Sequence, residues 1–298
     1  MSGAAQLQAI GAPVVSPVSF VSSSAAAAPS ASVSLAARYG LRVVETGVEV
    51  KSACDRCAIK AICLPEGLAQ SERQEFSALI FQPRRLRARQ TLFHAGDPFT
   101  HLYFVKTGAF KTVVLLDDGR EQITGFHFAG DVLGIDAISS PNHPSEAIAL
   151  DDASVCAITF AQLLRLSRRV EHLQTYVQRL LAREVVRDQR LLLLLGRMHA
   201  EERVAAFLLN LSQRFLVRGY SPQEFTLPMA REEIGNYLGL TLETVSRCFS
   251  RLRNAGVLAV VNRHIRICNV DALRNVVGAT ERVENRKTAK VARASASR

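Results

Sequence analysis

Four glycines recur at near-equal intervals in the stretch from about residue 81 to residue 160. Gly96, Gly108, Gly119 and Gly130 lie 12, 11 and 11 residues apart, with short apolar runs between them. Glycine readily adopts the backbone angles of tight turns, so this spacing predicts short strands joined by turns. In "DDGRE" we expect a hairpin turn in which Asp118 and Gly119 both have positive φ. The stretch therefore predicts a β-roll, or jelly roll.

The next stretch predicts one long helix, from about Glu171 to Leu195, because it contains neither Gly nor Pro. Positions at steps of three and four along it are apolar at four of six places, which is typical of a coiled-coil seam. We expect a dimerisation helix, and the alternative is an amphipathic helix that packs on its own β-domain. Two facing carboxylates of Asp188 would weaken such a dimer. The seam positions are Gln178, Leu181, Val185, Asp188, Leu192 and Leu195.

The last third of the chain predicts a winged helix-turn-helix. "REEIGNYLGLTLETVSRCFSRLRNAGVL" is typical of two helices around a tight turn at Gly239, with Thr241 capping the second helix. "LAVVNRHIRIC" predicts a hairpin that turns at Asn262 and Arg263. From Arg197 onward the basic residues exceed the acidic ones by eight, out of a net charge of +10 for the chain. This balance favours a polyanionic partner, either nucleic acid or an anionic membrane surface.

The second of these helices has two distinct faces. Val245, Phe249 and Leu252 are expected to face inward. The opposite face carries residue types that suit base edges in the major groove, namely Glu243, Ser246 and Arg247. The alternative is that Glu243 and Arg247 form a surface ion pair. Four further residues are expected on DNA phosphates: Arg251, Arg253, Arg263 and Arg266.

Three of the six cysteines lie in "CDRCAIKAIC", at positions Cys54, Cys57 and Cys63. Cys156 in "SVCAITF" is the candidate fourth ligand. Structural zinc sites usually pair two C-x2-C knuckles, whereas an iron–sulfur cluster tolerates a looser arrangement because its ligands bind different irons. The spacing alone leaves a cluster, a zinc ion and no metal all open. Cys248 and Cys268 are expected to be packing residues.

The first 37 residues contain no charged side chain and are rich in Ala, Ser and Val. Prolines at 13, 17 and 29 interrupt any apolar core of a secretory signal, so we expect a disordered leader. "LLLLL" at residues 191–195 is too short to span a bilayer. We therefore expect a cytoplasmic protein with no membrane partner, and reduced thiols.

Several separated motifs together resemble one known family. They are "CDRCAIKAIC", "TLFHAGD", "EQITGFHFAGDVLGIDAI", "VRDQ", "AEERVAAFLLNLSQRF", "YSPQEF" and "IGNYLGLTLETVSR", and the likeness covers about residues 50–278. The chain resembles the oxygen-sensing fumarate and nitrate reduction regulators, within the cyclic-AMP receptor protein superfamily of transcription factors.

The resemblance implies a [4Fe-4S] cluster on Cys54, Cys57, Cys63 and Cys156. It also implies a homodimer while the cluster is intact, conversion towards [2Fe-2S] by oxygen, and loss of DNA binding when the dimer separates. The implied target is an inverted repeat with TTGAT half-sites, and the implied outcome is activation of anaerobic genes through RNA polymerase. Arg120 stands where we expect an acidic residue in a loop that touches polymerase, which puts some promoter classes in doubt.

The expected fold class is α+β, with six segments along the chain. These are a leader (1–49), a cluster-ligand segment (50–70), a β-roll sensor domain (71–165), a dimerisation helix (166–196), a winged helix-turn-helix (197–278) and a flexible basic tail (279–298). A cyclic-nucleotide-dependent or zinc-dependent regulator on the same fold is the alternative. Against the former, the segment after Gly134 lacks an Arg for a cyclic phosphate and has Asp136 in place of Glu. Nothing in the sequence supplies a catalytic pocket, so we do not expect an enzyme.

Overall fold

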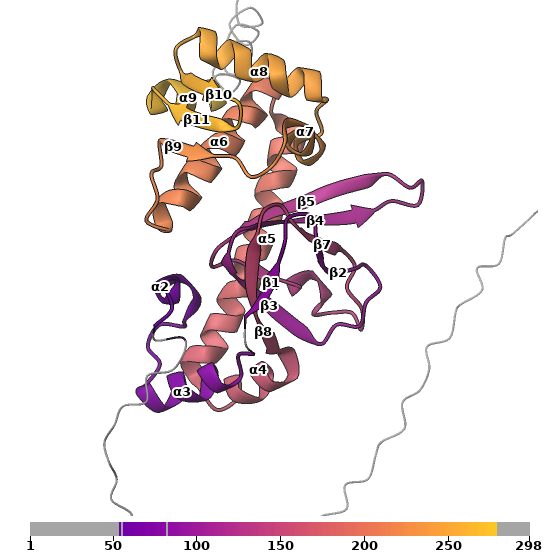
Figure 1. Cartoon of the computed structure of the whole chain (residues 1–298), viewed down its shortest axis with the longest axis vertical. Helices are drawn as coiled ribbons and strands as arrows, with labels where there is room; N and C mark the ends of the chain where they lie inside the picture. The colour runs from indigo at the N-terminus through magenta and orange to yellow at the C-terminus, as the bar shows by residue number, and fades with distance from the viewer. Residues whose placement is uncertain (1–53, 55, 82, 279–298) are drawn as a thin grey trace, which may run out of the picture. The chain divides into compact units, whose positions relative to one another are not determined.

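The structure is a computed structural model that describes residues 54, 56–81 and 83–278. The predicted leader and the predicted basic tail lie outside the described residues. In chain order, the described part contains a β-roll, a long helix and a winged helix-turn-helix, which confirms the predicted fold class (Figure 1).

Two four-stranded antiparallel sheets form the β-roll. Their strand orders are β1-β8-β3-β6 and β2-β7-β4-β5. Val105 and Val155 from the first sheet join Phe110 and Ala147 from the second in one buried cluster. The strands are β1 (Arg84–Leu86), β2 (Thr91–Phe93), β3 (His101–Thr107), β4 (Ala109–Leu115), β5 (Glu121–Phe128), β6 (Val132–Leu133), β7 (Glu146–Ala149) and β8 (Ala153–Thr159).

The regularly spaced glycines occupy turns, as predicted. Each has a positive φ, between 78° and 89°. The expectation for Asp118 was wrong, because Gly119 is the residue with positive φ in the β4–β5 turn and Asp118 is not. The connection is a longer loop than a two-residue hairpin turn: Leu116 N donates to Arg120 O and Gly119 N donates to Leu116 O. One left-handed residue therefore suffices to reverse the chain.

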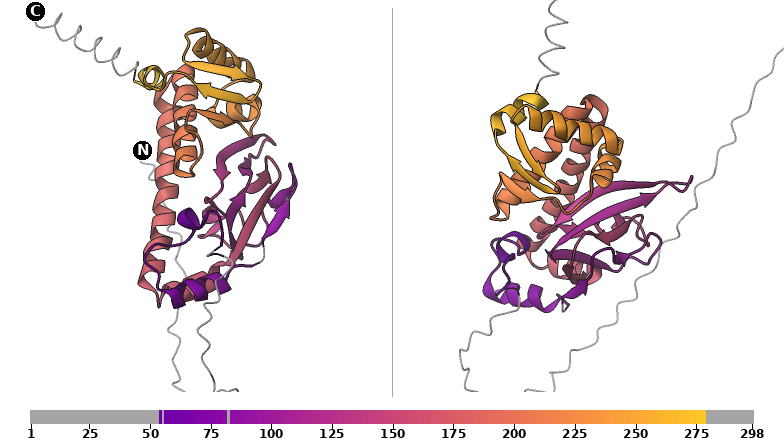
Figure 2. Two further views of the ribbon diagram at one scale, coloured as in Figure 1. Left: turned by 60° about the vertical axis from the view of Figure 1, so that its left-hand side comes forward. Right: turned by 45° about the horizontal axis from the view of Figure 1, so that its top comes forward.

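Four helices accompany the β-roll. The helix α3 begins at Gln70, and its first turn is capped by Glu72, which accepts from the backbone N–H of Ala69 at 2.8 Å. The predicted long helix is confirmed, and Figure 2 shows it passing alongside the β-roll. None of the described helices has a stretch apolar enough, over sufficient length, to cross a membrane. The helices are α2 (Lys60–Cys63), α3 (Gln70–Ala78), α4 (Phe160–Ser167) and α5 (Glu171–Arg197), and η1 (Ile135–Ala137) is a single 3-10 turn.

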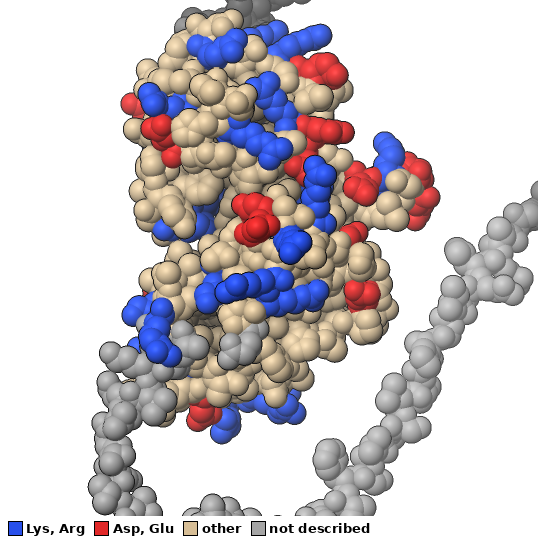
Figure 3. Space-filling view, in the orientation of Figure 1, with Lys and Arg blue, Asp and Glu red and all other residues tan. Residues whose placement is uncertain are grey.

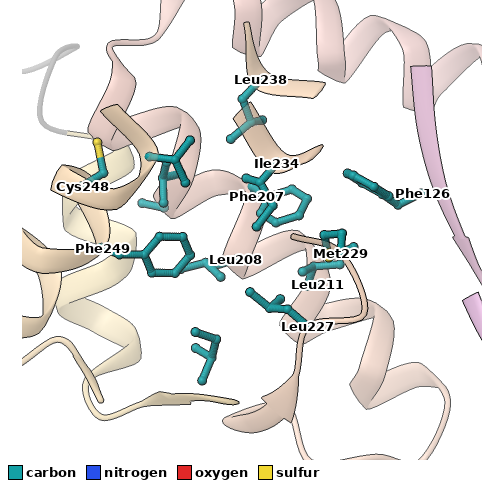
Figure 4. Packing of buried hydrophobic residues seen from close by; sticks show 14 of the residues in the cluster. Phe126, Phe207, Leu208, Leu211, Leu227, Met229, Ile234, Leu238, Cys248 and Phe249 are labelled. Atoms are coloured by element: carbon teal, nitrogen blue, oxygen red, sulfur yellow. The ribbon is translucent and has the colours of Figure 1, made fainter. Parts of the chain in front are cut away.

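The C-terminal domain packs around one helix, α6. Phe207 and Leu208 of α6 contact the buried faces of the two following helices, including Ile234 and Phe249 (Figure 4). The wing turns at Asn262, which has a φ of 55°, as its place in the predicted hairpin requires. The elements are α6 (Ala200–Val217), β9 (Glu224–Thr226), α7 (Arg231–Leu238), α8 (Leu242–Asn254), β10 (Leu258–Val261), β11 (His264–Ile267) and α9 (Val270–Val277).

The first helix of the helix-turn-helix contacts the edge strand of the β-roll. Asn236 of α7 accepts from the backbone N–H of Ile123 at 2.6 Å and donates to the carbonyl of Glu121 at 2.8 Å. Its side chain thus satisfies backbone groups of β5 that a neighbouring strand would otherwise pair. An ion pair of 2.8 Å between Lys111 and Glu233 lies beside it.

Candidate functional site

The turn before α8 is built from two glycines. Gly239 has a φ of 62°, in the left-handed region that favours glycine, as predicted. Gly235, which the sequence analysis did not single out, approaches the next segment so closely that a Cβ would lie 2.6 Å from the carbonyl oxygen of Leu240. Thr241 then caps α8, because its hydroxyl accepts from the backbone N–H of Thr244 at 3.2 Å. These contacts fix the direction in which α8 leaves the turn.

α8 has one buried and one accessible face, as predicted. Val245, Phe249 and Leu252 are buried, whereas Glu243 and Arg247 are exposed and Ser246 is half-buried. Hydrogen bonds from its own backbone N–H and from Thr241 lower the pKa of the Glu243 carboxyl, so this side chain stays a hydrogen-bond acceptor at neutral pH.

The alternative role as an intrahelical ion pair is not supported. Within the described residues, no ion pair joins Glu243 to Arg247, although other surface pairs of the domain form at 3.6 Å or less. Both side chains are exposed on the accessible face of α8.

The four arginines expected on phosphates differ in their surroundings. Arg251 pairs with Glu201 at 3.6 Å, and Arg266 pairs with Glu224 at 3.2 Å. Arg263 donates to a backbone carbonyl in the preceding loop, and Arg253 is exposed. Arg251 and Arg266 would have to exchange an ion pair for a phosphate contact. Basic side chains, mixed with acidic ones, lie over the end of the molecule that carries α8 (Figure 3).

The cysteine segment forms a turn followed by a single helical turn. Cys57 N donates to Cys54 O at 3.0 Å, Lys60 N donates to Cys57 O at 3.2 Å, and α2 ends at Cys63. Cys156 lies on β8, opposite Phe104 of β3. Cys63 and Cys156 pack against the same hydrophobic cluster at the foot of α5. The structure thus brings the end of the N-terminal segment to the strand that carries the predicted fourth ligand.

The environment of the cysteine segment raises the pKa of two thiols, Cys63 and Cys156. Burial raises the pKa of Cys63 to about 12, and charges on Cys54, Cys156 and Cys57 add to that rise. Burial also raises the pKa of Cys156, with further contributions from Cys54 and Cys57, while Lys106 opposes the rise. Thiolates gathered in this way repel one another, and a bound cation relieves that repulsion.

The arrangement does not match a site for a single ion. Among the described residues, no three His, Cys, Asp or Glu side chains are placed to hold one metal ion. A cluster of several irons binds each thiolate at a different corner, so its ligands need not converge on one point. All four candidate ligands are thiols, which is the ligand type of iron–sulfur clusters and also of structural zinc sites.

The two remaining cysteines behave differently from each other. Cys248 is buried in the core of the winged domain, as predicted. The prediction for Cys268 was wrong, because this residue is exposed. Ile265 and Ile267 point inward on β11, and side chains alternate along a strand, so Cys268 follows on the outward side.

Two contacts that the sequence analysis missed hold the cysteine segment. The Tyr176 hydroxyl of α5 donates to the carbonyl of Cys63 at 2.9 Å. Gly130, in the turn after β5, lies so close to α2 that a Cβ would come within 2.5 Å of the Ile62 side chain. Since Tyr176 is 113 residues from Cys63, no local pattern could reveal the first contact.

The segment after Gly134 packs closely against a buried histidine. His143 is 2% exposed, stacks on Phe93 with ring centroids 3.8 Å apart, and lies against Gly134. Asp136, which stands where a ribose-binding Glu would be needed, accepts a hydrogen bond from Ser145 instead.

The seam positions of α5 are accessible. Only Leu173 and Leu180 of this helix are buried, whereas Val185 is 55% and Leu192 is 69% exposed. Leu181 and Asp188 are also exposed, and Leu195 is half-buried. The beginning of the helix therefore packs on its own β-domain, and the predicted seam remains open on the surface.

Comparison with known proteins places the chain in a family. A cyclic nucleotide-binding domain matches residues 83–170, and a Crp-like helix-turn-helix domain matches residues 202–276. The fumarate and nitrate reduction regulatory protein of Escherichia coli (strain K12) is 45% identical over 230 residues, covering 77% of this chain and 92% of that protein. The fumarate nitrate reduction regulatory protein of Klebsiella oxytoca is 44% identical over the same length.

Solved structures agree with this placement. FixK2 from Bradyrhizobium japonicum is 36% identical with a TM-score of 0.61, covering 65% of this chain and 96% of that one. CooA from Carboxydothermus hydrogenoformans, at 18% identity, 71% and 92% coverage and a TM-score of 0.56, supports the fold alone. The chain belongs to the family of fumarate and nitrate reduction regulators within the Crp superfamily, whose members are DNA-binding transcription regulators rather than enzymes.

Proposed function

We propose that this chain is an oxygen-responsive transcription regulator. In the absence of oxygen, Cys54, Cys57, Cys63 and Cys156 hold a [4Fe-4S] cluster, the chain dimerises through α5, and α8 binds inverted repeats with TTGAT half-sites. The main outcome is activation of anaerobic genes. The observation that carries the proposal is that thiols from two distant segments lie close enough to influence the half-buried Cys63 at the foot of α5.

The proposed cofactor supplies an oxygen-labile link between the N-terminal segment and β8. Three of its ligands lie on a segment with little packing of its own, since none of the four residues of α2 is buried. The fourth lies on a central strand of the β-roll. Closing the link would give the loose segment one position relative to the strand.

A direct hydrogen bond links the cysteine segment to α5. Cys63 is hydrogen-bonded to Tyr176, which lies two residues before Gln178, the first seam position. The exposed apolar side chains along the seam offer a dimer interface, and Asp188 in its middle opposes association. A dimer that is only marginally stable is one that a change at the cysteine segment can shift.

Dimerisation gives the DNA-binding surface its affinity. A twofold axis along α5 would present two copies of α8 to successive major grooves, about 34 Å apart. Glu243, Ser246 and Arg247 would contact base edges in each half-site. Two linked contacts bind far more tightly than either half-site alone, because the second contact is made at high effective concentration.

RNA polymerase is the proposed protein partner, and the β4–β5 loop is the proposed contact. Leu115 and Leu116 are exposed beside this loop, and acidic side chains gather at its tip (Figure 3). Arg120 is paired with Asp118 at 2.7 Å, so it partly neutralises that acidic tip. This pairing is consistent with activation that differs between promoter classes.

The test combines two measurements on protein purified without oxygen. Iron and acid-labile sulfide are quantified, and binding to a TTGAT palindrome is measured before and after exposure to air. We expect about four irons and four sulfides per chain, with DNA binding that is lost in air. A colourless protein that contains zinc and no sulfide would overturn the cofactor, and binding that is unaffected by air would overturn the sensing function.

A further inference from the structure

We infer that Arg231 is a positioning residue for base recognition, which commits the hydroxyl of Ser246 to bases that present a hydrogen-bond acceptor. Arg231 and Ser246 are 15 residues apart in the sequence. Arg231 lies on α7, whereas Ser246 lies on the recognition helix α8. This inference rests on the proposed sequence-specific binding of DNA, and it deepens that function by assigning what one of the base-reading side chains can recognise.

The guanidinium of Arg231 is held between two residues of α8. Its Nη1 lies 3.4 Å from Oγ of Ser246. Its Cζ lies 5.4 Å from the ring centroid of Phe249, within the range of a cation–π contact. Phe249 is 2% exposed, so its ring is fixed by the core and provides a stable support. As the first residue of α7, Arg231 is anchored to the helix that the turn holds against α8.

The chemistry of the pair is asymmetric. An arginine side chain carries only donors, whereas a hydroxyl has one donor hydrogen and two acceptor lone pairs. When Arg231 donates to Ser246, one lone pair is occupied and the hydroxyl hydrogen points elsewhere. The neighbouring positive charge also disfavours approach of an amino group. Ser246 is thereby biased towards O4 of thymine and O6 or N7 of purines, and away from the amino groups of cytosine and adenine.

A second arginine, Arg253, lines the same small hollow as Arg231 and provides a matched control. The volume of the hollow is about 180 Å³, and its lining includes Arg231, Phe249, Ser250, Arg253 and Asn262. Arg253 therefore carries the same charge into the same hollow from α8, but no hydrogen bond joins it to Ser246 in the described structure. A change at Arg253 tests the loss of positive charge alone.

The experiment measures binding of the full chain, prepared without oxygen, to the TTGAT palindrome and to every single-base variant of one half-site. The proteins are the wild type, Arg231→Ala, Arg253→Ala, Ser246→Ala and the double variant of Arg231 and Ser246. We expect Arg231→Ala to reduce discrimination at one base pair by about three- to tenfold, chiefly by improving relative binding to bases that present an amino group. Ser246→Ala should remove discrimination at the same base pair, and the double variant should match Ser246→Ala. Arg253→Ala should weaken binding to all sites alike.

Three results would count against the inference. If Arg231→Ala weakens all sites equally, as Arg253→Ala does, Arg231 acts only on the DNA backbone. If Arg231→Ala and Ser246→Ala affect different base pairs, or their effects on discrimination add in the double variant, the two side chains do not act as a unit. A wild-type protein that shows no preference for the palindrome would instead overturn the proposed function, which is a distinguishable outcome. Circular dichroism of each variant confirms that α7 and α8 remain folded.

Discussion

The two working ends of this protein are held in very different ways. The DNA-reading end is set by a capped helix, a glycine turn and a continuous core, in which Ile234, Leu238 and Val245 are fully buried. At the cysteine end, α2 is a four-residue helix with no buried residue, tied to its surroundings by the Tyr176 hydrogen bond and the packing of Ile62 on Gly130. The output surface is thus preorganised by a buried core, whereas α2 at the input segment buries none of its residues. This difference suits a switch. The proposed cluster would link the cysteine segment to β8, and a weakly packed segment can change its position more than a well-packed one.

The largest effect is expected from removing Cys156, the proposed ligand that lies on β8 of the β-roll. We expect Cys156→Ala to abolish iron and sulfide binding, because the three N-terminal thiols would lose their tie to the β-roll. DNA binding without oxygen should fall to the level of the air-exposed wild type. Cys268→Ala is the matched control, since Cys268 is an exposed thiol far from the site. Full iron and sulfide content in Cys156→Ala would refute the ligand assignment.

The second test leaves the cysteines unchanged and strengthens the proposed dimer seam of α5. Asp188→Ala removes the two carboxylates that face each other in the proposed dimer, so we expect dimers and DNA binding to persist in air. Analytical ultracentrifugation and gel-shift assays, before and after exposure to air, provide the measurement.

Glu184→Ala is the control for that test. Glu184 is also an acidic residue of α5, but it pairs with Arg187 on the side that faces the β-roll. It should therefore retain the air sensitivity of the wild type. If Asp188→Ala is as air-sensitive as the wild type, the seam does not act as the switch.

A third test addresses the contact that joins the β-roll to α6. Asp131, next to Gly130, pairs with Arg214 and Arg218. Burial would raise the pKa of Asp131, but the two guanidiniums outweigh it and hold this pKa at about 2. Because the folded-state pKa lies below the unfolded one, the carboxylate contributes stability above about pH 4, and that contribution is lost as the pH falls towards 2.

We therefore expect Asp131→Asn to lower the free energy of unfolding by about 2 kcal/mol at pH 7. The deficit should shrink steadily below pH 4, because Asp131 of the unfolded wild-type chain then becomes protonated while the folded carboxylate is still ionised. Urea unfolding of both proteins at pH 7 and pH 3 gives the comparison. A deficit of the same size at both pH values would mean that packing, rather than the charge of Asp131, supports this contact.

Local patterns predicted the DNA-reading end better than the cysteine end. Thr241 and Gly239 act on their immediate neighbours, so a capping residue and a turn glycine are recognisable without a structure. The supports of Ser246 and Cys63 come from Arg231 and Tyr176, which approach only when distant helices pack together. Cys268 was a failure of a different kind. The prediction for Cys268 relied on the tendency of cysteine to be buried. The alternation of side chains along β11 would have placed this residue on the exposed side.

The smallest effect is expected from a variant that weakens the attachment of the cysteine segment to α5. Tyr176→Phe removes one hydrogen bond to the Cys63 carbonyl and keeps the ring. We expect a loss of about 1 kcal/mol, confined to the cysteine segment. Amide hydrogen exchange should accelerate about fivefold around residues 60–68, while α8 exchanges as in the wild type. Phe249→Leu is the counterpart at the rigid end, and it should accelerate exchange throughout α8 because Phe249 belongs to a shared core. If Tyr176→Phe instead accelerated exchange in α8 as well, the two ends would form one cooperative unit, and the cysteine segment would not be the independent input that the proposed switch requires.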